Sequence, residues 1–558
     1  MKKLISIITC IILISATFSG CGEKKEVINY IYPINNKIQN YDPQIASNTD
    51  EFVLIENTFE GLVRVNDDGT VHNGVAEDWS ISDDKLTYTF NIRKGTKWRI
   101  NDAIKELMGE DFNPDITAND FVFALQRAAS PDTQSPLFPT IACIKNAVNI
   151  KSGKLSAKEL GVTAKDNYTL VITLDTPNDE FLNVLSSSIA MPCNEEFFNS
   201  TNGRYGLQAK YTLFNGQFYL RQVLESSYLL RNNESYVGEA KLNGNNNTNK
   251  KTKTRIDLTL KVINDENRDK TFELIEKGYY DAAFISGTDS KKIKRNSGVT
   301  YTPYDDTTWG FVYNCKDEIF SNKSMREAFS LGISRKDSYK EEYFKNATSF
   351  APPSCKIGPN KIENFVTNTY NQDKEKSIKL WNEGIKKLGN PEIEITVITT
   401  ENMVSTVKEL IQGVQSGIGS ISSYSNGKPM KFTLKVEALS QYELDSKIAS
   451  GEFDVAFCSF KAESPSAISF YSDFSNNNIS RFDKTKLDNY ILEATQTFDS
   501  NSAKQSILKC EEEIQNSYCI YPVLFESSYY TCAKNVDGIQ FHPGTGRVSF
   551  VYATQKKK

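Results

Sequence analysis

The chain has 558 residues, of which 39% are hydrophobic and 24% are charged, the balance of a soluble globular protein. A chain of this length is too long to fold around a single hydrophobic core, so two or more lobes are expected. The formal net charge is −5, and it becomes −7 once residues 1–20, with Lys2 and Lys3 and no acid, are set aside, which argues against nucleic acid as a partner.

The amino terminus has the pattern of an export signal. Lys2 and Lys3 precede an apolar run over residues 4–16, which is too short and too weakly flanked for a membrane-spanning helix. Residues 18–21, Phe-Ser-Gly-Cys, resemble a bacterial lipobox, so we expect cleavage before Cys21 and attachment of diacylglycerol to it. This hypothesis places the protein on the extracellular face of the bacterial cell membrane, attached through the lipid anchor only. A plain secretory signal with an incidental cysteine is the alternative.

Eight further cysteines follow the signal. Their spacings form no CxxC pair and no zinc-finger frame, so they do not predict a metal site. In an exported protein they are either buried free thiols or members of one or two disulfides, and the sequence leaves both possibilities open. They are Cys143, Cys193, Cys315, Cys355, Cys458, Cys510, Cys519 and Cys532.

Hydrophobic periodicity predicts the first elements after the signal. Residues 27–32 form a short apolar strand, and residues 52–59 carry apolar side chains at helical spacing. Over residues 86–92, apolar and polar side chains alternate with period two, which is typical of a strand with one face buried. Turn residues lie before this strand at 83–85 and after it at 94–95.

The stretch from Phe59 to Trp98 resembles the signature of the extracellular solute-binding proteins of family 5, the peptide-, nickel- and oligosaccharide-binding receptors of ABC importers. The matching positions are Glu60-Gly61-Leu62, Ala76-Glu77-Asp78-Trp79, Leu86-Thr87-Tyr88-Thr89-Phe90, Arg93-Lys94-Gly95 and Trp98. The resemblance implies a two-lobed α/β fold of the periplasmic-binding-protein type (type II, cluster C), with an extra subdomain in the first lobe. The implied boundaries are a signal peptide 1–20, a tether 21–26, the first lobe 27–70, its extra subdomain 71–180, the first lobe again 181–305, the second lobe 306–519 and a return to the first lobe 520–558.

Several later segments fit this organisation. Residues 101–114 are interpreted as a surface insertion, and Thr117 with Asp120 as the capping box of the helix that follows. Residues 181–191 are predicted to form a helix that leads to Pro192.

The remaining pattern predicts two α/β lobes and a hinge. Residues 256–285 and 393–459 each predict strands separated by helices, a βαβ-like unit that occurs twice. Residues 308–314 resemble the family's strand that crosses between lobes, and residues 520–523 resemble its return. Two crossings permit closure around a ligand, because a few terminal residues can absorb the rotation.

The resemblance also implies a set of ligand-binding residues. In peptide-binding members a segment shortly after the first Asp-Pro contributes main-chain hydrogen bonds, and counting from Asp42-Pro43 places it at Ser47-Asn48-Thr49. The opposing strand is Ser459-Phe460-Lys461, and positions near the ligand's side-chain pockets are Phe284, Ile285, Trp309 and Gly310.

One further acidic residue is expected to bind the amino terminus of the ligand. Relatives usually carry an aspartate in an Ala-Asp-Tyr-x-x-Pro segment, which pairs with the α-ammonium group of the peptide. Here the longer Glu463 takes that place, and Ser464 replaces the tyrosine. An ordinary exposed loop acid is the alternative interpretation of Glu463.

Catalytic motifs are not found. The chain has two histidines, His72 and His542, neither in an HExxH frame, and the serine within residues 413–417 has the wrong glycine spacing for a nucleophile elbow. We therefore expect no enzyme, no catalytic residue, no metal and no cofactor.

The expected function is capture of oligopeptides by a monomer and their delivery to the permease subunits of an ABC importer. The alternatives are nickel, haem or an oligosaccharide bound on the same fold, or a signalling lipoprotein or hydrolase. The scarcity of histidine weakens the nickel and haem alternatives, because histidine is the commonest ligand for such metals.

Overall fold

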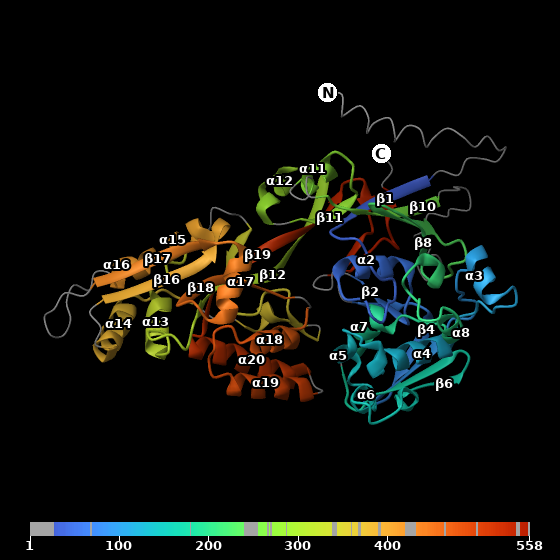
Figure 1. Cartoon of the computed structure of the whole chain (residues 1–558), viewed down its shortest axis with the longest axis horizontal. Coiled ribbons are helices and arrows are strands. Elements are labelled where there is room, and N and C mark those ends of the chain that lie inside the picture. The colour runs from blue at the N-terminus through green and yellow to red at the C-terminus, as the bar shows by residue number, and fades with distance from the viewer. Residues whose placement is uncertain are drawn as a thin grey trace.

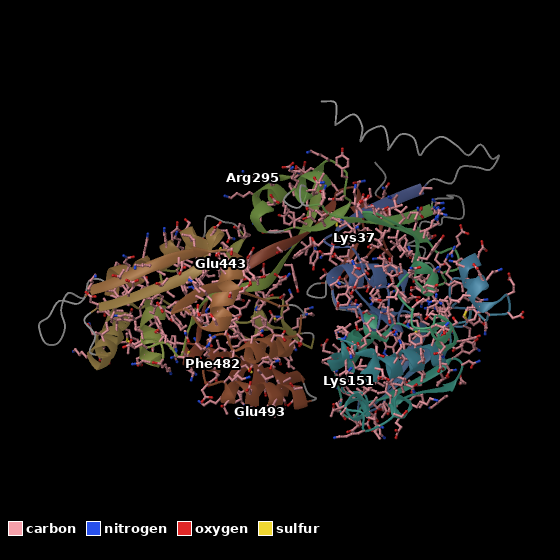
Figure 2. The ribbon with its side chains drawn as sticks, viewed as in Figure 1. Lys37, Lys151, Arg295, Glu443, Phe482 and Glu493 are labelled. Carbon is pink, nitrogen blue, oxygen red and sulfur yellow. The ribbon has the colours of Figure 1, made fainter. Side chains whose placement is uncertain are left out.

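Two α/β lobes lie side by side and are joined by long strands that run between them in this computed structural model (Figure 1). The described residues are 27–66, 70–178, 180–238, 255–264, 267, 270–285, 287–336, 343–358, 360–366, 370–388, 392–418, 431–462, 465–497, 500–542 and 547–555. Lys151 in the first lobe and Glu493 in the second lie at the ends of the lobes away from the joining strands (Figure 2). Within these ranges, no helix is long and apolar enough to span a membrane.

The first lobe is built on a four-stranded sheet with the order β1-β10-β9-β8. Its strands are β1 (Val27–Ile34), β8 (Phe218–Leu224), β9 (Ser227–Asn232) and β10 (Arg255–Val262). Strands β1 and β10 are parallel, whereas the other pairs are antiparallel. Helix α2 (Thr49–Thr58) packs against β8, and its N-cap Asn48 accepts from the Glu51 N–H at 3.0 Å. The predicted strand over 27–32 and the helix over 52–59 are confirmed.

A second, antiparallel four-stranded sheet with the order β4-β5-β7-β6 forms the extra subdomain of the first lobe. Its strands are β4 (Ala76–Ile81), β5 (Thr87–Ile92), β6 (Val162–Asp166) and β7 (Thr169–Thr173). Tyr88, Phe90 and Ile92 are buried, so the alternation over 86–92 is confirmed. Helix α4 (Ala118–Ala129) covers this sheet and begins with the predicted capping box of Thr117 and Asp120. The short helices α5 (Phe138–Ile141) and α6 (Ala147–Lys151) follow.

The segment interpreted as a surface insertion has its own packed helix. Residues 102–108 form α3 (Asp102–Met108), because the Asn101 side chain accepts from the Ile104 N–H at 3.0 Å and caps the first turn. Ile104 is buried against the lobe. The segment is therefore attached to the core as well as exposed.

The predicted helix over residues 181–191 is wrong in its length. The structure has α7 (Phe181–Leu185) followed by a 3₁₀ turn over Ser188–Ala190. The hydroxyls of Ser186 and Ser187 donate to carbonyl oxygens three residues earlier, at 2.7 and 2.6 Å. Such local side-chain bonds compete with continuation of the helix and end it. Helix α8 (Glu195–Ser200) comes next.

The second lobe contains a seven-stranded sheet with the order β11-β19-β12-β18-β16-β17, to which β13 is added at β19. The strands are β11 (Ala282–Ile285), β12 (Val299–Tyr313), β13 (Phe344–Asn346), β16 (Glu392–Thr400), β17 (Lys431–Leu439), β18 (Val455–Lys461) and β19 (Ile520–Ala533). The antiparallel pair β12 and β19 joins the lobes (Figure 1). Successive side chains of β12 enter separate cores on the two faces of the sheet, with Phe311 and Tyr313 in one and Val312 in the other.

Helices cover both faces of this sheet and its end near the hinge. They are α11 (Thr271–Glu276), α12 (Ser290–Arg295), α13 (Lys323–Gly332), α14 (Lys374–Leu388), α15 (Val404–Leu410), α16 (Gln412–Ile418), α17 (Gln441–Ser450), α18 (Ala467–Asn477), α19 (Thr485–Gln496) and α20 (Ser500–Ser517). Short strand pairs complete the chain: β2 (Val63–Val65) with β3 (Val71–Asn73), β14 (Lys356–Ile357) with β15 (Asn360–Lys361), β20 (Val536–Asp537) with β23 (Thr554–Gln555), and β21 (Gln540–His542) with β22 (Arg547–Ser549).

Only one of the two predicted βαβ-like units is a true βαβ unit. Strands β16, β17 and β18 lie in one sheet, and β16 is parallel to both of its neighbours. In contrast, β10 and β11 belong to different sheets, although β11 begins beside β1 of the first lobe, where the Asp281 N–H donates to the Ile31 carbonyl oxygen at 2.9 Å. Sequence periodicity predicts strands and helices but does not assign a strand to a sheet, which explains this error.

A buried ion pair holds the loop that follows β1. Two nitrogens of Arg127, on α4, donate to the two oxygens of Asp42, each at 2.6 Å. Both side chains are almost fully buried, with 8% and 4% of their surfaces exposed. The Arg127 guanidinium also lies over the rings of Phe198 and Tyr205, at 4.8 and 5.2 Å from the ring centres. The pair therefore ties the extra subdomain to the loop that leads into α2.

A second buried charge cluster joins α2 to the carboxyl-terminal strands. Arg547, at the start of β22, has a nitrogen 3.3 Å from Glu56 Oε2, and His542 Nε2 lies 3.7 Å from Glu56 Oε1. Arg64 donates to Glu60 Oε1 at 3.0 Å. Burial, with Arg547 and Arg64 nearby, lowers the pKa of His542 well below its usual 6.5. His542 is therefore neutral in the folded protein at neutral pH.

Candidate ligand-binding site

Strand β18 brings three of the predicted binding residues beside the crossing strand. Its register with β12 sets Ser459 opposite Trp309, Phe460 opposite Thr308 and Lys461 opposite Thr307. Phe460 is anchored by its ring, which lies 5.0 Å from the ring centre of Phe350. The sheet therefore fixes the backbone of this predicted ligand-binding strand rigidly.

The other edge of β18 is open over the same residues. Strand β16 pairs with β18 only at Val455 and Ala456, and the Thr399 hydroxyl then donates to the Phe457 carbonyl oxygen at 2.9 Å. Among the described residues, no strand pairs with this edge from Cys458 to Lys461. An unpaired strand edge can take up an extended peptide through main-chain hydrogen bonds.

Trp309, on β12, is held in a fixed position beside this strand edge by two contacts. Its ring stacks on Phe457, with centres 5.7 Å apart and planes inclined at 21°, and its Nε1–H donates to Glu526 Oε2 at 2.7 Å. Burial raises the pKa of Glu526, and the nearby Asp306 raises it further, whereas the hydrogen bond from Trp309 and the charge of Lys461 lower it. A partly buried carboxylate on β19, opposite Thr307, therefore accepts a hydrogen bond from the tryptophan.

Gly310 is needed where the two crossing strands approach each other. The register of β12 with β19 shifts between Trp309 and Gly310. A Cβ atom at position 310 would lie 2.9 Å from the carbonyl oxygen of Tyr521 on β19. Because that atom belongs to the backbone, a side chain here would push the strands apart. Gly310 therefore permits the close approach of β12 and β19 where they cross between the lobes.

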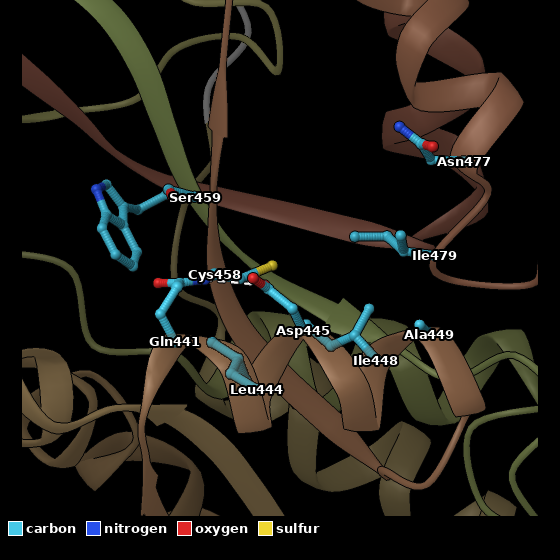
Figure 3. A pocket seen from close by; sticks show the side chains of 10 residues that line it. Gln441, Leu444, Asp445, Ile448, Ala449, Cys458, Ser459, Asn477 and Ile479 are labelled. Atoms are coloured by element: carbon cyan, nitrogen blue, oxygen red, sulfur yellow. Dashed lines mark hydrogen bonds between the residues drawn. The ribbon is translucent and has the colours of Figure 1, made fainter. Parts of the chain in front are cut away.

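A hollow of about 400 Å³ adjoins the open edge (Figure 3). One wall is a face of α17 that presents Gln441, Leu444, Asp445 and Ile448 at helical spacing. The rest of the lining comes from Trp309, Ala449, Cys458, Ser459, Asn477 and Ile479. Within the hollow the Gln441 side-chain amide donates to Asp445 Oδ1 at 2.9 Å.

The sequence around α17 positions this wall. Ser440 and Glu443 form a capping box at the start of the helix, and Gly451 ends it in the left-handed conformation, at φ 86°. The guanidinium of Arg481 donates to the carbonyl oxygens of Ile448 and Ala449, at 3.1 and 2.8 Å. These contacts satisfy the carboxyl end of α17 and hold it against the loop after α18.

Phe284 and Ile285 lie on β11, on the other side of β19 from Trp309. Ile285 is buried in a small core, whereas Phe284 is partly exposed and packs against Tyr530, with ring centres 4.8 Å apart. Tyr530 in turn contacts Tyr304 and Phe541. These rings form an aromatic cluster at the crossing, in which Tyr304 and Tyr530 are buried and Phe284 is exposed, and Ile285 is not part of it.

Ser47, Asn48 and Thr49 are exposed in the first lobe, at the start of α2. The Ser47 N–H donates to Glu51 Oε2 at 2.8 Å, and the Asn48 carbonyl oxygen accepts from the Phe52 N–H at 3.0 Å. Those two main-chain groups are therefore used by the helix start. The structure gathers Trp309, Gly310, Ser459, Phe460 and Lys461 at one place, and leaves Ser47-Asn48-Thr49 on the other lobe.

Two predicted residues, Cys21 and Glu463, lie outside the described residues. Of the cysteine alternatives, the structure has the free thiols: all eight cysteines after the signal are unpaired in it. In the part of the chain that is described, no group of three or more His, Cys, Asp and Glu side chains is arranged to hold a metal ion.

Two lobes that share a pair of crossing strands, with a hollow and an open strand edge beside the crossing, define a two-lobed solute-binding protein. The chain belongs to the bacterial extracellular solute-binding proteins of family 5, whose family model, described as the middle part of these proteins, matches residues 70–481.

Known relatives cover nearly the whole chain. It is 23% identical over 567 residues to the dipeptide-binding protein of Lactococcus lactis subsp. cremoris, covering 97% of each. It is 24% identical over 585 residues to the oligopeptide-binding protein OppA of Bacillus subtilis, covering 99% of each. The solved structure of the murein tripeptide-binding protein MppA in its unliganded open form has a TM-score of 0.67 at 21% identity, and covers 96% of this chain and 98% of that one. Listeria monocytogenes OppA bound to peptide has a TM-score of 0.63 at 22% identity, covering 96% and 100%. These likenesses place the chain in the same two-lobed fold.

Sequence reasoning missed the wall contributed by α17. Leu444 and Ile448 stand four residues apart and mark a helix face in the sequence, and the same spacing places Gln441 and Asp445 on that face. The sequence does not predict that α17 lies beside the unpaired end of β18. That position depends on where β16 stops pairing with β18.

Proposed function

We propose that this protein captures oligopeptides between its lobes and delivers them to the permease subunits of an ABC importer. The observation that carries the proposal is the open edge of β18 from Cys458 to Lys461, fixed by β12 and bordered by a hollow. The full-length relatives named for dipeptide and oligopeptide binding support the same ligand class.

In this proposal the peptide lies extended along β18 and meets the first lobe on its other side. Main-chain hydrogen bonds give affinity for any peptide sequence, while the hollow and the exposed ring of Phe284 contact side chains of the peptide. Ser47-Asn48-Thr49 contribute from the first lobe through the main-chain groups that α2 does not use. Closure follows from rotation about the paired strands β12 and β19.

Calorimetric titration with random-sequence peptides of increasing length tests the proposal. Because pairing is through the main chain, affinity should depend on length more than on sequence. Binding restricted to one sugar or to a metal chelate, with no peptide bound, would contradict it.

Glu463 is proposed to pair with the α-ammonium group of the peptide. Removal of an acid that pairs with a buried ligand charge costs about 2–5 kcal/mol, a loss of roughly 30-fold or more in affinity. Glu463→Gln and wild type should therefore differ for a free peptide and agree for its N-acetylated form. Equal affinities in all four titrations would show that the amino terminus is not recognised by this residue.

Cys21 is proposed as the lipidated residue and the only membrane attachment. One diacylglycerol supplies two acyl chains, which is what stable anchoring needs. Cys21→Ala in the native host should leave the protein unprocessed or released into the medium, as judged by fractionation and intact mass. A variant that is still cleaved after Gly20 and still membrane-bound would rule out the lipoprotein assignment.

A further inference from the structure

The hollow beside β18 has the properties of a subsite for one ligand side chain. Its volume of about 400 Å³ lies at the small end of the ~300–1,000 Å³ range of small-molecule sites, too small for a whole extended peptide. It opens beside Cys458 and Ser459, at the start of the unpaired strand edge. Because alternate side chains of a bound strand point to opposite sides, one side chain of a peptide on this edge would enter the hollow.

The charge of the lining is asymmetric. Among its ten residues there is one carboxylate, Asp445, and no lysine or arginine. No ion pair within the described ranges includes Asp445, although the neighbouring Lys447 is paired with Glu437 at 2.7 Å. Asp445 lies close enough to Cys458 to help raise the pKa of that buried thiol, for which burial is the main cause. The carboxylate is therefore an exposed acid in the lining beside the strand edge, and no ion pair among the described residues neutralises it.

The walls of the hollow suit a long aliphatic stem. Leu444, Ile448 and Ala449 line it on α17, and Ile479 lines it after α18 (Figure 3). A hydrocarbon stem can be covered by such walls while its charged end stays at a polar rim. Gln441 holds the carboxylate of Asp445 in place by donating to one of its oxygens, which leaves the second oxygen for a ligand.

We propose that this hollow is a subsite for a lysine or arginine side chain of the bound peptide, with Asp445 as the residue that selects the positive charge. The proposal rests on peptide binding as the function, and it adds a charge preference that main-chain pairing alone does not give. An α-ammonium group has the same charge and is the competing source of a cation, so the test separates the two.

Titration with a positional set of peptides tests the proposal. Alanine pentapeptides with a free amino terminus carry Lys, Gln or Glu at one position, which is varied from the second to the fifth. At one position the Lys peptide should bind about 2- to 5-fold more tightly than the Gln peptide, as expected for an exposed, partly screened ion pair, and the Glu peptide should bind more weakly than both.

Substitution of Asp445 then assigns the preference to this residue. In Asp445→Asn the Lys-to-Gln affinity ratio should fall to near one while the Gln peptide binds as in wild type. Glu452→Gln is the matched control, since it removes one exposed acid just beyond α17, outside the lining, and it should keep the wild-type ratio. N-acetylation of the Lys peptide should leave the effect of Asp445→Asn unchanged.

The outcomes separate this inference from the proposed function. If peptides bind but no position discriminates Lys from Gln, or the preference survives in Asp445→Asn, the inference is wrong and peptide binding stands. If the effect of Asp445→Asn disappears on N-acetylation, Asp445 recognises the α-ammonium group and the side-chain subsite is wrong. If no peptide binds at all, the proposed function fails and the inference fails with it.

Discussion

Replacement of Arg127 by leucine should strongly destabilise the first lobe. The change removes both guanidinium donors from Asp42, whose side chain is 4% exposed, and leaves its carboxylate without a cation. Removal of one member of a buried ion pair typically costs about 3–5 kcal/mol, because the remaining charge is neither hydrated nor neutralised. Asp42 keeps one hydrogen bond, from the Gln44 N–H at 3.0 Å, which is weak compensation. We therefore expect a loss in that range for Arg127→Leu.

Amide hydrogen exchange of α4 measures the loss, because it reports the opening free energy of the helix that carries Arg127. The double variant Asp42→Asn/Arg127→Leu is the control. It removes the stranded charge, so it should be more stable than Arg127→Leu alone by at least about 1 kcal/mol. A single variant that loses less than about 1 kcal/mol, or a double variant less stable than the single one, would refute the reasoning.

Two further predictions concern pH. Trp309→Phe keeps an aromatic ring stacked on Phe457 but removes the N–H that donates to Glu526. The free energy of unfolding should therefore fall by about 1–3 kcal/mol at pH 7. Since protonation removes the stranded charge of Glu526, the difference from wild type in urea titrations should shrink towards pH 5, and a constant difference would contradict this. His542 is neutral when folded and has a pKa near 6.5 when unfolded, so stability should fall as the pH drops below about 6.5, by up to about 1.4 kcal/mol per pH unit. His542→Gln should flatten this slope in parallel urea titrations, and an unchanged slope would mean that other groups cause it.

Much of the fold follows from local sequence patterns. The alternation of apolar and polar side chains predicts β5, and the capping box of Thr117 and Asp120 predicts the start of α4. Both patterns are local, because each depends on a few neighbouring residues. The break after α7 was missed because it depends on two serine hydroxyls that return to the backbone, a choice that periodicity does not encode. The separation of β10 and β11 into different sheets was missed because pairing partners are distant in sequence.

For the candidate site too, some residues were predicted from the sequence and others depend on the assembled fold. Trp309 and Ser459 to Lys461 were predicted from resemblance, and the register of β12 with β18 brings them together. The open edge and Asp445 depend on the place where β16 leaves β18, which is a property of the assembled sheet. Ile285 resembles a pocket residue by position but belongs to a core, because neighbouring side chains of a strand face opposite sides.

The crossing strands also determine when this chain can fold. Strand β19 lies between β11 and β12 in the sheet, yet it comes from residues 520–533, near the carboxyl end. The neighbours it separates are complete by residue 313, more than two hundred residues earlier. Pairings of such long sequence separation form slowly, since the intervening chain must be ordered first. A ribosome-bound or truncated chain that lacks residues 520–533 therefore leaves β11, β12 and β13 without the strand that pairs with all three, and such unpaired strand edges are prone to aggregation until β19 has been made.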